Sequence, residues 1–243
     1  VHLPLSNEAV LEAQMLMLQA HNILNPANGA PITVPAQDMV LGLYYITKLR
    51  KGAKGEGLTF YGPEEALIAY NEGKVDIHAI INVVAKDLDE NGNIVDKMIK
   101  ETSVGREIVN EIVPAEVGYL NTIISKKSLR DIISDVIKAV GVARACEFLD
   151  GIKNLGYKMA FEGGLSFNLG DIIIPKEKEE LVKRGHEEIE QIMMNYNMGF
   201  ITDNERYNQV IDTWTHVNSD LSDILYKTIK NDDQGFNSVF MML

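Results

Sequence analysis

Apolar positions in the last third of the chain recur every three or four residues, which is the period of an amphipathic helix. One such stretch covers residues 176–197, and a second covers residues 203–230. The positions that carry the pattern are Val182, His186, Ile189, Met193 and Tyr196, followed by Tyr207, Val210, Trp214, Val217, Leu221, Ile224 and Thr228. Two heptad-patterned helices with so short a connector predict an antiparallel helical hairpin over residues 176–230.

The first 170 residues carry shorter and more varied patterns. Capping residues, prolines and glycines bound the stretches with helical spacing, and the expected helices cover residues 6–24, 35–47, 62–73, 102–113, 125–140 and 143–155. Residues 77–85 and 94–100 are rich in β-branched and aliphatic side chains, and the turn signal Asp89-Glu90-Asn91-Gly92 between them predicts a β-hairpin. Glycines crowd residues 156–170, where we expect irregular backbone. Together these patterns predict an α+β, mostly helical fold.

The composition is that of a globular chain with a buried core. Hydrophobic residues make up 46% of the 243 residues, and charged residues make up 24%. Cys146 is the only cysteine, which excludes an internal disulfide and a multi-cysteine zinc site. No apolar run approaches the roughly 18–20 residues of a membrane-spanning helix, and no secretory signal precedes Ser6. We therefore expect a cytoplasmic protein with no membrane partner and, because it does not begin with Met, a piece of a longer chain.

The distribution of charge is uneven. The net charge of −12 argues against wrapping nucleic-acid phosphates. Basic residues nevertheless cluster locally, at Lys48, Arg50, Lys51 and Lys54 and again at Lys126, Lys127 and Arg130. The second arm of the predicted hairpin is acidic, with Asp203, Glu205, Asp212, Asp220 and Asp223. This arm is either an ordinary solvated helix face or a docking surface for a basic partner.

Familiar catalytic signatures are absent from the sequence: it contains no phosphate-binding Walker loop, no zinc-protease motif and no nucleophile elbow. The five histidines show no metal-ligand spacing, and His78 is expected to lie half-exposed in a strand. Residues 25–38 are more informative, because three prolines fix the backbone while Asn28 and Gln37 present amides suited to a ribose or a phosphate. The competing interpretation is a rigid structural loop whose amides satisfy its own backbone.

Seven motifs are spread over the whole chain: residues 1–6 (VHLPLS), 22–29 (NILNPANG), 37–45, 55–57, 102–106 (TSVGR), 205–214 (ERYNxVIDxW) and 236–242. In this order they resemble the largest subunit, β′, of bacterial DNA-directed RNA polymerases. The resemblance implies a nucleotidyltransferase whose three magnesium-binding aspartates are expected just upstream of Val1, and whose trigger loop and bridge helix are expected downstream of Leu243. Magnesium would then be a cofactor of the intact polymerase, with no catalytic residue, metal or cofactor in this chain, which would be inactive alone.

The resemblance also divides the chain by expected role. Residues 1–24 would end the active-site domain, residues 25–170 would form the pore around the secondary channel, and residues 171–243 would form the funnel with its hairpin. The matching loop of the family lies beside the catalytic loop, which makes Asn28, Gln37 and Asp38 proximal to the active site. The hairpin matches the rim helices that dock channel-binding factors of the Gre and DksA types, and the matching residues are Glu205, Arg206, Asn208 and Asp212.

Further partners follow from the same resemblance. They are the β, α, ω and sigma subunits, the DNA template, RNA and nucleoside triphosphates. Gln209 stands where many members of the family have lysine, which argues against a guanosine-tetraphosphate site that relies on a cation there. Two alternatives remain at this stage: a stand-alone protein-docking module that uses the acidic hairpin, and an independent metabolic enzyme, for which the sequence offers no constellation of titratable residues.

Overall fold

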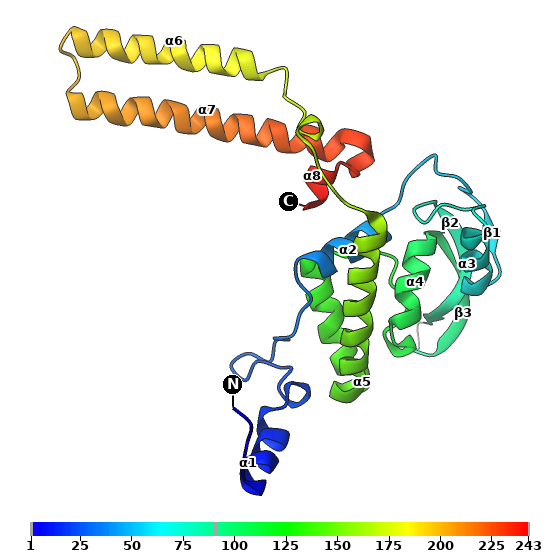
Figure 1. Cartoon of the computed structure of the whole chain (residues 1–243). Coiled ribbons are helices and arrows are strands. Elements are labelled where there is room, and N and C mark those ends of the chain that lie inside the picture. Colours follow the sequence, from blue (N-terminus) through cyan, green and yellow to red (C-terminus); the bar gives the residue numbers. More distant parts are fainter. Residues whose placement is uncertain (1, 90–91, 243) are drawn as a thin grey trace. The chain divides into compact units, whose positions relative to one another are not determined.

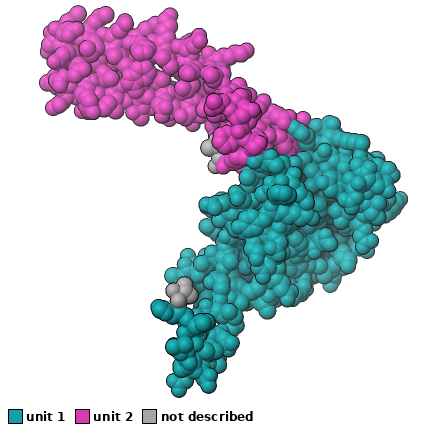
Figure 2. All heavy atoms as spheres, viewed as in Figure 1, with its two compact units in different colours: residues 1–165 teal, residues 166–243 magenta. Residues whose placement is uncertain are grey.

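The computed structural model describes residues 2–89 and 92–242, and the chain divides into two compact units, residues 1–165 and 166–243 (Figure 2). Unit 1 contains α1 (Asn7–Glu12), α2 (Asp38–Thr47), β1 (Thr59–Phe60), α3 (Pro63–Asn71), β2 (Ile81–Leu88), β3 (Ile94–Thr102), α4 (Val104–Ile112) and α5 (Lys126–Gly163) (Figure 1). Unit 2 contains α6 (Lys178–Asn197), α7 (Asp203–Asn231) and α8 (Ser238–Met242). The predicted α+β, mostly helical class is confirmed.

The sheet of unit 1 has the strand order β1-β2-β3, in which β1 is parallel and β3 antiparallel to β2. The predicted β-hairpin is confirmed by the pairing of β2 with β3, whereas Glu90 and Asn91 of its turn lie outside the described residues. Sequence patterns missed β1, because two residues are too few to show a period.

The start of β2 is a correction to the prediction. Residues 77–79 form a turn in which Asp76 Oδ1 accepts the His78 N–H at 2.9 Å, so the strand begins at Ile81. His78 is buried and not half-exposed, because its ring packs edge-on against Tyr45 and its Nδ1 lies 3.0 Å from the Lys48 carbonyl oxygen. Burial lowers the pKa of His78, because the charged imidazolium loses hydration.

The main core of unit 1 forms where α2 and α4 pack against α5. Its fully buried side chains include Leu43, Ile46, Leu129, Ile133 and Ile152. Arg106 of α4 is also buried: its Nε donates to the Thr47 carbonyl oxygen at 2.9 Å, and its guanidinium donates to Asn121 Oδ1 at 2.7 Å. The same Thr47 accepts the Ile124 N–H on its hydroxyl at 3.0 Å, so one residue ties α2 to both α4 and the start of α5.

The closest approach in this core is between α2 and α5. A Cβ added at Gly42 would collide with the carbonyl oxygen of Gly156, and a Cβ at Gly156 would lie 2.6 Å from the Met39 carbonyl oxygen. Residues 156–163 therefore form the last turns of α5, where the glycine content had predicted irregular backbone. The expected stop at Gly141 is real but local, since its φ of 78° breaks the helix and the chain resumes helical geometry. α2 starts at Asp38 and not near Pro35, because Gln37 has a φ of 49°.

Unit 2 is dominated by the antiparallel pair α6 and α7, the predicted hairpin (Figure 1). Thr202 and Glu205 form a reciprocal capping box at the start of α7. The seam is only partly buried: Gly185, Thr213 and Ile229 are buried, whereas most other seam side chains are half-exposed. Tyr207, which the heptad pattern placed on the seam, is 60% exposed.

Candidate functional site

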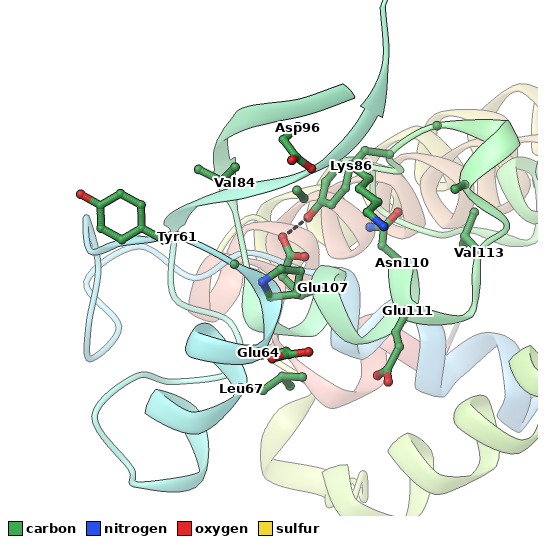
Figure 3. A pocket seen from close by; sticks show the side chains of 16 residues that line it. Tyr61, Glu64, Leu67, Val84, Lys86, Asp96, Glu107, Asn110, Glu111 and Val113 are labelled. Carbon is green, nitrogen blue, oxygen red and sulfur yellow. Dashed lines mark hydrogen bonds between the residues drawn. The ribbon is translucent and has the colours of Figure 1, made fainter. Parts of the chain in front are cut away.

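A pocket of about 560 Å³ opens in unit 1 between the sheet and helices α3 and α4 (Figure 3). Its wall combines apolar side chains with four carboxyl groups and an amine. The charged side chains are Glu64 from α3, Lys86 from β2, Asp96 from β3, and Glu107 and Glu111 from α4. A pocket of this size is typical of sites for small molecules.

Glu107 is the most deeply buried of these charged groups, with only 3% of its surface exposed. It lies in the first turn of α4, a helix that starts where the Ser103 hydroxyl accepts the Arg106 N–H at 3.2 Å. Glu107 Oε1 accepts a hydrogen bond from the Tyr119 hydroxyl at 2.5 Å, and that hydroxyl also lies 2.7 Å from Thr102 Oγ1 (Figure 3). The carboxyl group is therefore held in one orientation.

Burial raises the pKa of Glu107 to about 7, against which the hydrogen bond from Tyr119 acts only in part. Burial likewise raises the pKa of Tyr119, with the adjacent Glu107 carboxylate as a further cause. Glu107 therefore changes charge near neutral pH inside a cavity. Groups with strongly shifted pKa values in pockets are candidates for functional residues.

The loop that carries Tyr119 is fixed on both sides. The backbone N–H of Tyr119 donates to Asp87 Oδ1 at 3.1 Å, and the Asp87 carboxylate forms an ion pair with Lys97 at 3.1 Å. Asn110 exchanges two hydrogen bonds with the backbone of Leu120, at 2.8 and 3.0 Å. These contacts make the wall of the pocket rigid, so its shape is present before any ligand arrives.

Sequence reasoning missed this pocket. The motif at residues 102–106 contributes to the resemblance, but nothing in it indicates that the next residue, Glu107, is buried in a pocket. The available signal was its position three residues after Val104, which places a carboxylate on the face of α4 that carries the buried Val104. The partner Tyr119 comes from a loop and has no such signal.

The loop of residues 25–38 satisfies much of its own backbone. Asn28 Oδ1 accepts the Ala30 N–H at 3.0 Å, and Asn25 Oδ1 accepts the Ala27 N–H at 2.9 Å. Gln37 and Asp38 are exposed at the start of α2, where the Gln37 side chain makes no capping bond. No hydrogen bond or ion pair within residues 2–89 and 92–242 joins Asn28 to Gln37 or Asp38. The role of these three residues beside an active site stays a prediction.

The predicted docking residues lie at the hairpin tip, here residues 193–212, and two of them have structural partners. The Glu205 carboxylate accepts the Thr202 N–H at 2.7 Å, which holds the pKa of Glu205 below its usual range. Arg206 forms an ion pair with Asp203 at 2.6 Å and lies 5.1 Å from the centre of the Tyr196 ring. Asn208 and Asp212 are exposed.

The hairpin tip also exposes apolar side chains, which sequence reasoning did not treat as a surface. The most exposed ones share a position at or near the connector between α6 and α7. They are Met194, Met198, Phe200, Tyr207 and Ile211. Methionine and aromatic side chains are common at protein-binding surfaces because they adapt their shape and bury large areas.

Metal ligands do not gather in the described part of the chain. Within residues 2–89 and 92–242, no three His, Cys, Asp or Glu side chains lie together in a way that could hold a metal ion. Among the helices of the same residues, none is both long and apolar enough to cross a membrane.

Comparison with known proteins gives a consistent result. The sequence profile of the family "RNA polymerase Rpb1, domain 3" matches residues 22–172. Over all 243 residues the chain is 94% identical to DNA-directed RNA polymerase subunit beta′ of Phocaeicola vulgatus, 86% identical to that of Bacteroides fragilis and 84% identical to that of Bacteroides thetaiotaomicron. The chain spans 17% of the length of each of these relatives. This chain belongs to the RNA polymerase Rpb1 domain 3 family, within the largest subunit of DNA-directed RNA polymerases.

Proposed function

We propose that this chain is a working segment of an RNA polymerase β′ subunit and supports DNA-templated RNA synthesis. The observation that carries the proposal is its 94% identity, without a gap in coverage of the chain, to the beta′ subunit of Phocaeicola vulgatus. The partners would be the β, α, ω and sigma subunits, template DNA, RNA and nucleoside triphosphates. The chain would act within this assembly, because the resemblance puts the magnesium-binding aspartates upstream of Val1.

We further propose that the chain lines the channel through which nucleotides reach the active site. In this arrangement the loop of Asn28, Gln37 and Asp38 would lie next to the catalytic loop. Two features would keep this loop in a fixed conformation: Pro35 is buried, and the Asn28 side chain accepts a hydrogen bond from the backbone N–H of Ala30 in the same loop. Gln37 and Asp38 would remain available for contacts with neighbouring parts of the polymerase.

The hairpin would dock protein factors of the Gre and DksA types at the rim of that channel. The hairpin tip combines exposed acids at Asp203 and Asp212 with exposed apolar side chains at Met198 and Phe200. An apolar centre flanked by charge is the usual make-up of a protein-binding surface. Glu205 and Arg206 would contribute mainly by keeping the tip in shape, through the capping box and the pair with Asp203.

A segment exchange tests the main proposal. The beta′ subunit of Bacteroides fragilis, 86% identical over the chain, would be made with this chain in place of its matching segment and reconstituted with its other subunits. We expect an assembled polymerase that transcribes at a rate comparable to the unaltered enzyme. Failure to assemble, or assembly without transcription, would contradict the proposal.

The isolated chain provides the complementary test. Supplied with magnesium, primed template and nucleoside triphosphates, it should make no RNA. Any polymerisation would mean that the catalytic metal is held within this chain, and the proposed division of labour would be wrong.

A binding titration tests the docking role and separates it from a purely structural hairpin. The reconstituted polymerase would be titrated with a Gre- or DksA-type protein, with Asp212→Lys as the test variant and Asp223→Lys, an exposed acid farther along the same arm, as the matched control. We expect Asp212→Lys to weaken binding by about tenfold and the control to have little effect. If both variants bound the factor as tightly as the parent, Asp212 would not belong to the docking surface.

A further inference from the structure

The pocket in unit 1 plays no part in the proposed docking role, and its chemistry points to a ligand. Only 3% of the surface of Glu107 is exposed, and this residue lines the pocket. One carboxylate oxygen accepts the Tyr119 hydroxyl, and the other accepts no hydrogen bond from the described residues. The second oxygen, on a side chain that lines the pocket, can accept a hydrogen bond from a ligand that enters it.

Other charges around the pocket favour a donor that is a cation. Three more carboxyl groups line the wall, from Glu64, Asp96 and Glu111, whereas Lys86 is the one amine among the lining residues that the structure describes. Lys86 is exposed and forms no ion pair with any described carboxylate. The potential inside the pocket is therefore negative whenever Glu107 is ionised, and low-dielectric walls strengthen it.

The rest of the wall favours an apolar or aromatic body on that cation. Leu67, Val84, Val113 and Tyr119 line the pocket. Tyr61 also belongs to the wall, but its side chain is 86% exposed and projects away from Glu107 (Figure 3). A ligand with a flat or branched hydrocarbon part can bury that part against these side chains while its charged end reaches Glu107. A hydrated metal ion would leave the apolar wall uncovered.

We propose that this pocket binds a small organic cation, in which an ammonium or amidinium group pairs with Glu107 and an apolar body packs against Leu67, Val84 and Val113. The charged end donates to the free oxygen of Glu107, and the Tyr119 hydroxyl holds the other oxygen in place. Asp96 and Glu111 add attraction from β3 and α4 without direct contact. The site is independent of the hairpin and of the factor-docking role.

Binding should depend on pH in a way that identifies Glu107. The cation stabilises the ionised carboxylate, and burial raises the pKa of Glu107 to about 7 in the free chain. The ionised fraction of such a group rises about tenfold between pH 6 and pH 8. Affinity should rise by the same factor. The other titratable or charged groups around Glu107 and its partner Tyr119 are Glu64, Lys86, Asp87, Asp96, Arg106 and Glu111.

The experiment uses the 243-residue chain and benzamidine, an aromatic amidinium, as the probe. Its neutral counterpart benzamide has nearly the same shape and serves as the matched probe. Calorimetric titrations at pH 6, 7 and 8 should show benzamidine binding at least tenfold more tightly than benzamide at pH 8, with an affinity that falls about tenfold by pH 6. Equal binding of the two compounds, or binding of neither, would overturn the proposal.

Two variants locate the site. Glu107→Gln keeps the size of the side chain and an oxygen that can accept the Tyr119 hydroxyl, so the fold should persist while benzamidine affinity drops at least tenfold and loses its pH dependence. Ala115→Trp places a large ring at an exposed residue of the pocket wall and should block binding with Glu107 intact. Glu72→Gln, an exposed glutamate paired with Lys74 away from the pocket, is the control. Unchanged binding in both pocket variants would show that the cation binds elsewhere.

Discussion

Two pairs of helices in this chain are held together in different ways. In unit 1, α2 and α5 meet backbone to backbone at Gly42 and Gly156, with fully buried side chains around the contact. In unit 2, α6 and α7 meet through a seam of side chains that stay half-exposed, such as Trp214 and Val217. The first pair depends on complementary shape between residues far apart in sequence, whereas the second depends on a repeated local pattern.

The difference has consequences for how each unit tolerates change. A packed interior offers no room for added atoms, so small changes in volume are felt. A half-exposed seam can shift its side chains toward solvent. We therefore expect substitutions in unit 1 to cost far more than equivalent ones in unit 2. Trp214, the single tryptophan of the chain, reports on the hairpin, and far-ultraviolet circular dichroism reports on both units.

The largest effect should come from Gly42→Val. The new side chain would collide with the backbone of Gly156, and helices α2 and α5 would have to separate. We expect a loss of at least about 3 kcal/mol in the free energy of unfolding of unit 1. Urea denaturation followed by circular dichroism measures this loss.

The hairpin, followed by the fluorescence of Trp214, should still unfold at the same urea concentration as in the parent chain. A shift of both signals together would show that the two helix pairs are not independent, and the comparison would fail.

The second largest effect is the pH dependence that Glu107 gives to unit 1. The pKa of this carboxyl is about 7 in the folded chain and 4.5 in its ordinary state. Stability from the buried, protonated form is therefore fully present below pH 4.5 and is lost as the pH rises through 7, by up to about 3 kcal/mol.

The measurement is urea denaturation of the parent and Glu107→Gln at pH 5, 6, 7 and 8. The parent should lose stability relative to the variant across this range, and the hairpin signal should not change with either. Parallel pH curves for the two proteins would refute a raised pKa at Glu107.

A smaller effect is expected at the start of α7. Thr202→Ala removes the hydroxyl that accepts the Glu205 N–H and breaks the capping box, which should cost the hairpin about 1 kcal/mol. Thr215→Ala, within the same helix, removes only a hydroxyl bond to the Ile211 carbonyl oxygen and should be neutral or slightly stabilising. Thermal unfolding followed by Trp214 fluorescence measures the stability of both variants. Equal losses of stability would show that the capping box does not stabilise the hairpin.

The smallest effect should come from Gly185→Ala, the counterpart of the change at Gly42. The added Cβ would lie 3.1 Å from Val217 Cγ2, a tight contact that a side chain can relieve. Alanine also favours helix over glycine by about 1 kcal/mol, so the net change in hairpin stability should stay below about 1 kcal/mol. Urea denaturation monitored by fluorescence measures it, and a loss as large as that at Gly42 would mean that the seam is as rigid as the core.

The same contrast explains what could be predicted from sequence. The hairpin was predicted to within two residues at each helix end, because its period and its short connector are local features of the sequence. The contact of Gly42 with Gly156 could not be predicted, since a glycine that allows close helix packing has the same local signature as one that breaks a helix. The predicted end of the helix at residue 155 was wrong for this reason. The pairing of β2 with β3 was right, but β2 starts later, after the turn at Asp76, and both strands end two or three residues later than predicted.

The same distinction between local and distant neighbours applies to what the sequence could predict of the candidate sites. Asn208 and Asp212 are exposed on the hairpin tip, and their role in docking stays a prediction. Glu205 acts in capping through its local neighbour Thr202, whereas the position of Arg206 over Tyr196 depends on a neighbour across the connector. Glu107 escaped notice because its burial and its pKa are set by Tyr119 and the sheet, which only the folded chain brings together.

Thr47 has a consequence for the order in which the chain can fold. Its carbonyl oxygen accepts from Arg106, 59 residues later, and its hydroxyl accepts from Ile124, 77 residues later. Such distant partners must close long loops, which slows folding, whereas a helical hairpin closes through neighbours and forms quickly. During synthesis the end of α2 can therefore complete its hydrogen bonds only after Ile124 has left the ribosome. Helices α6 and α7 can pair as soon as both have emerged.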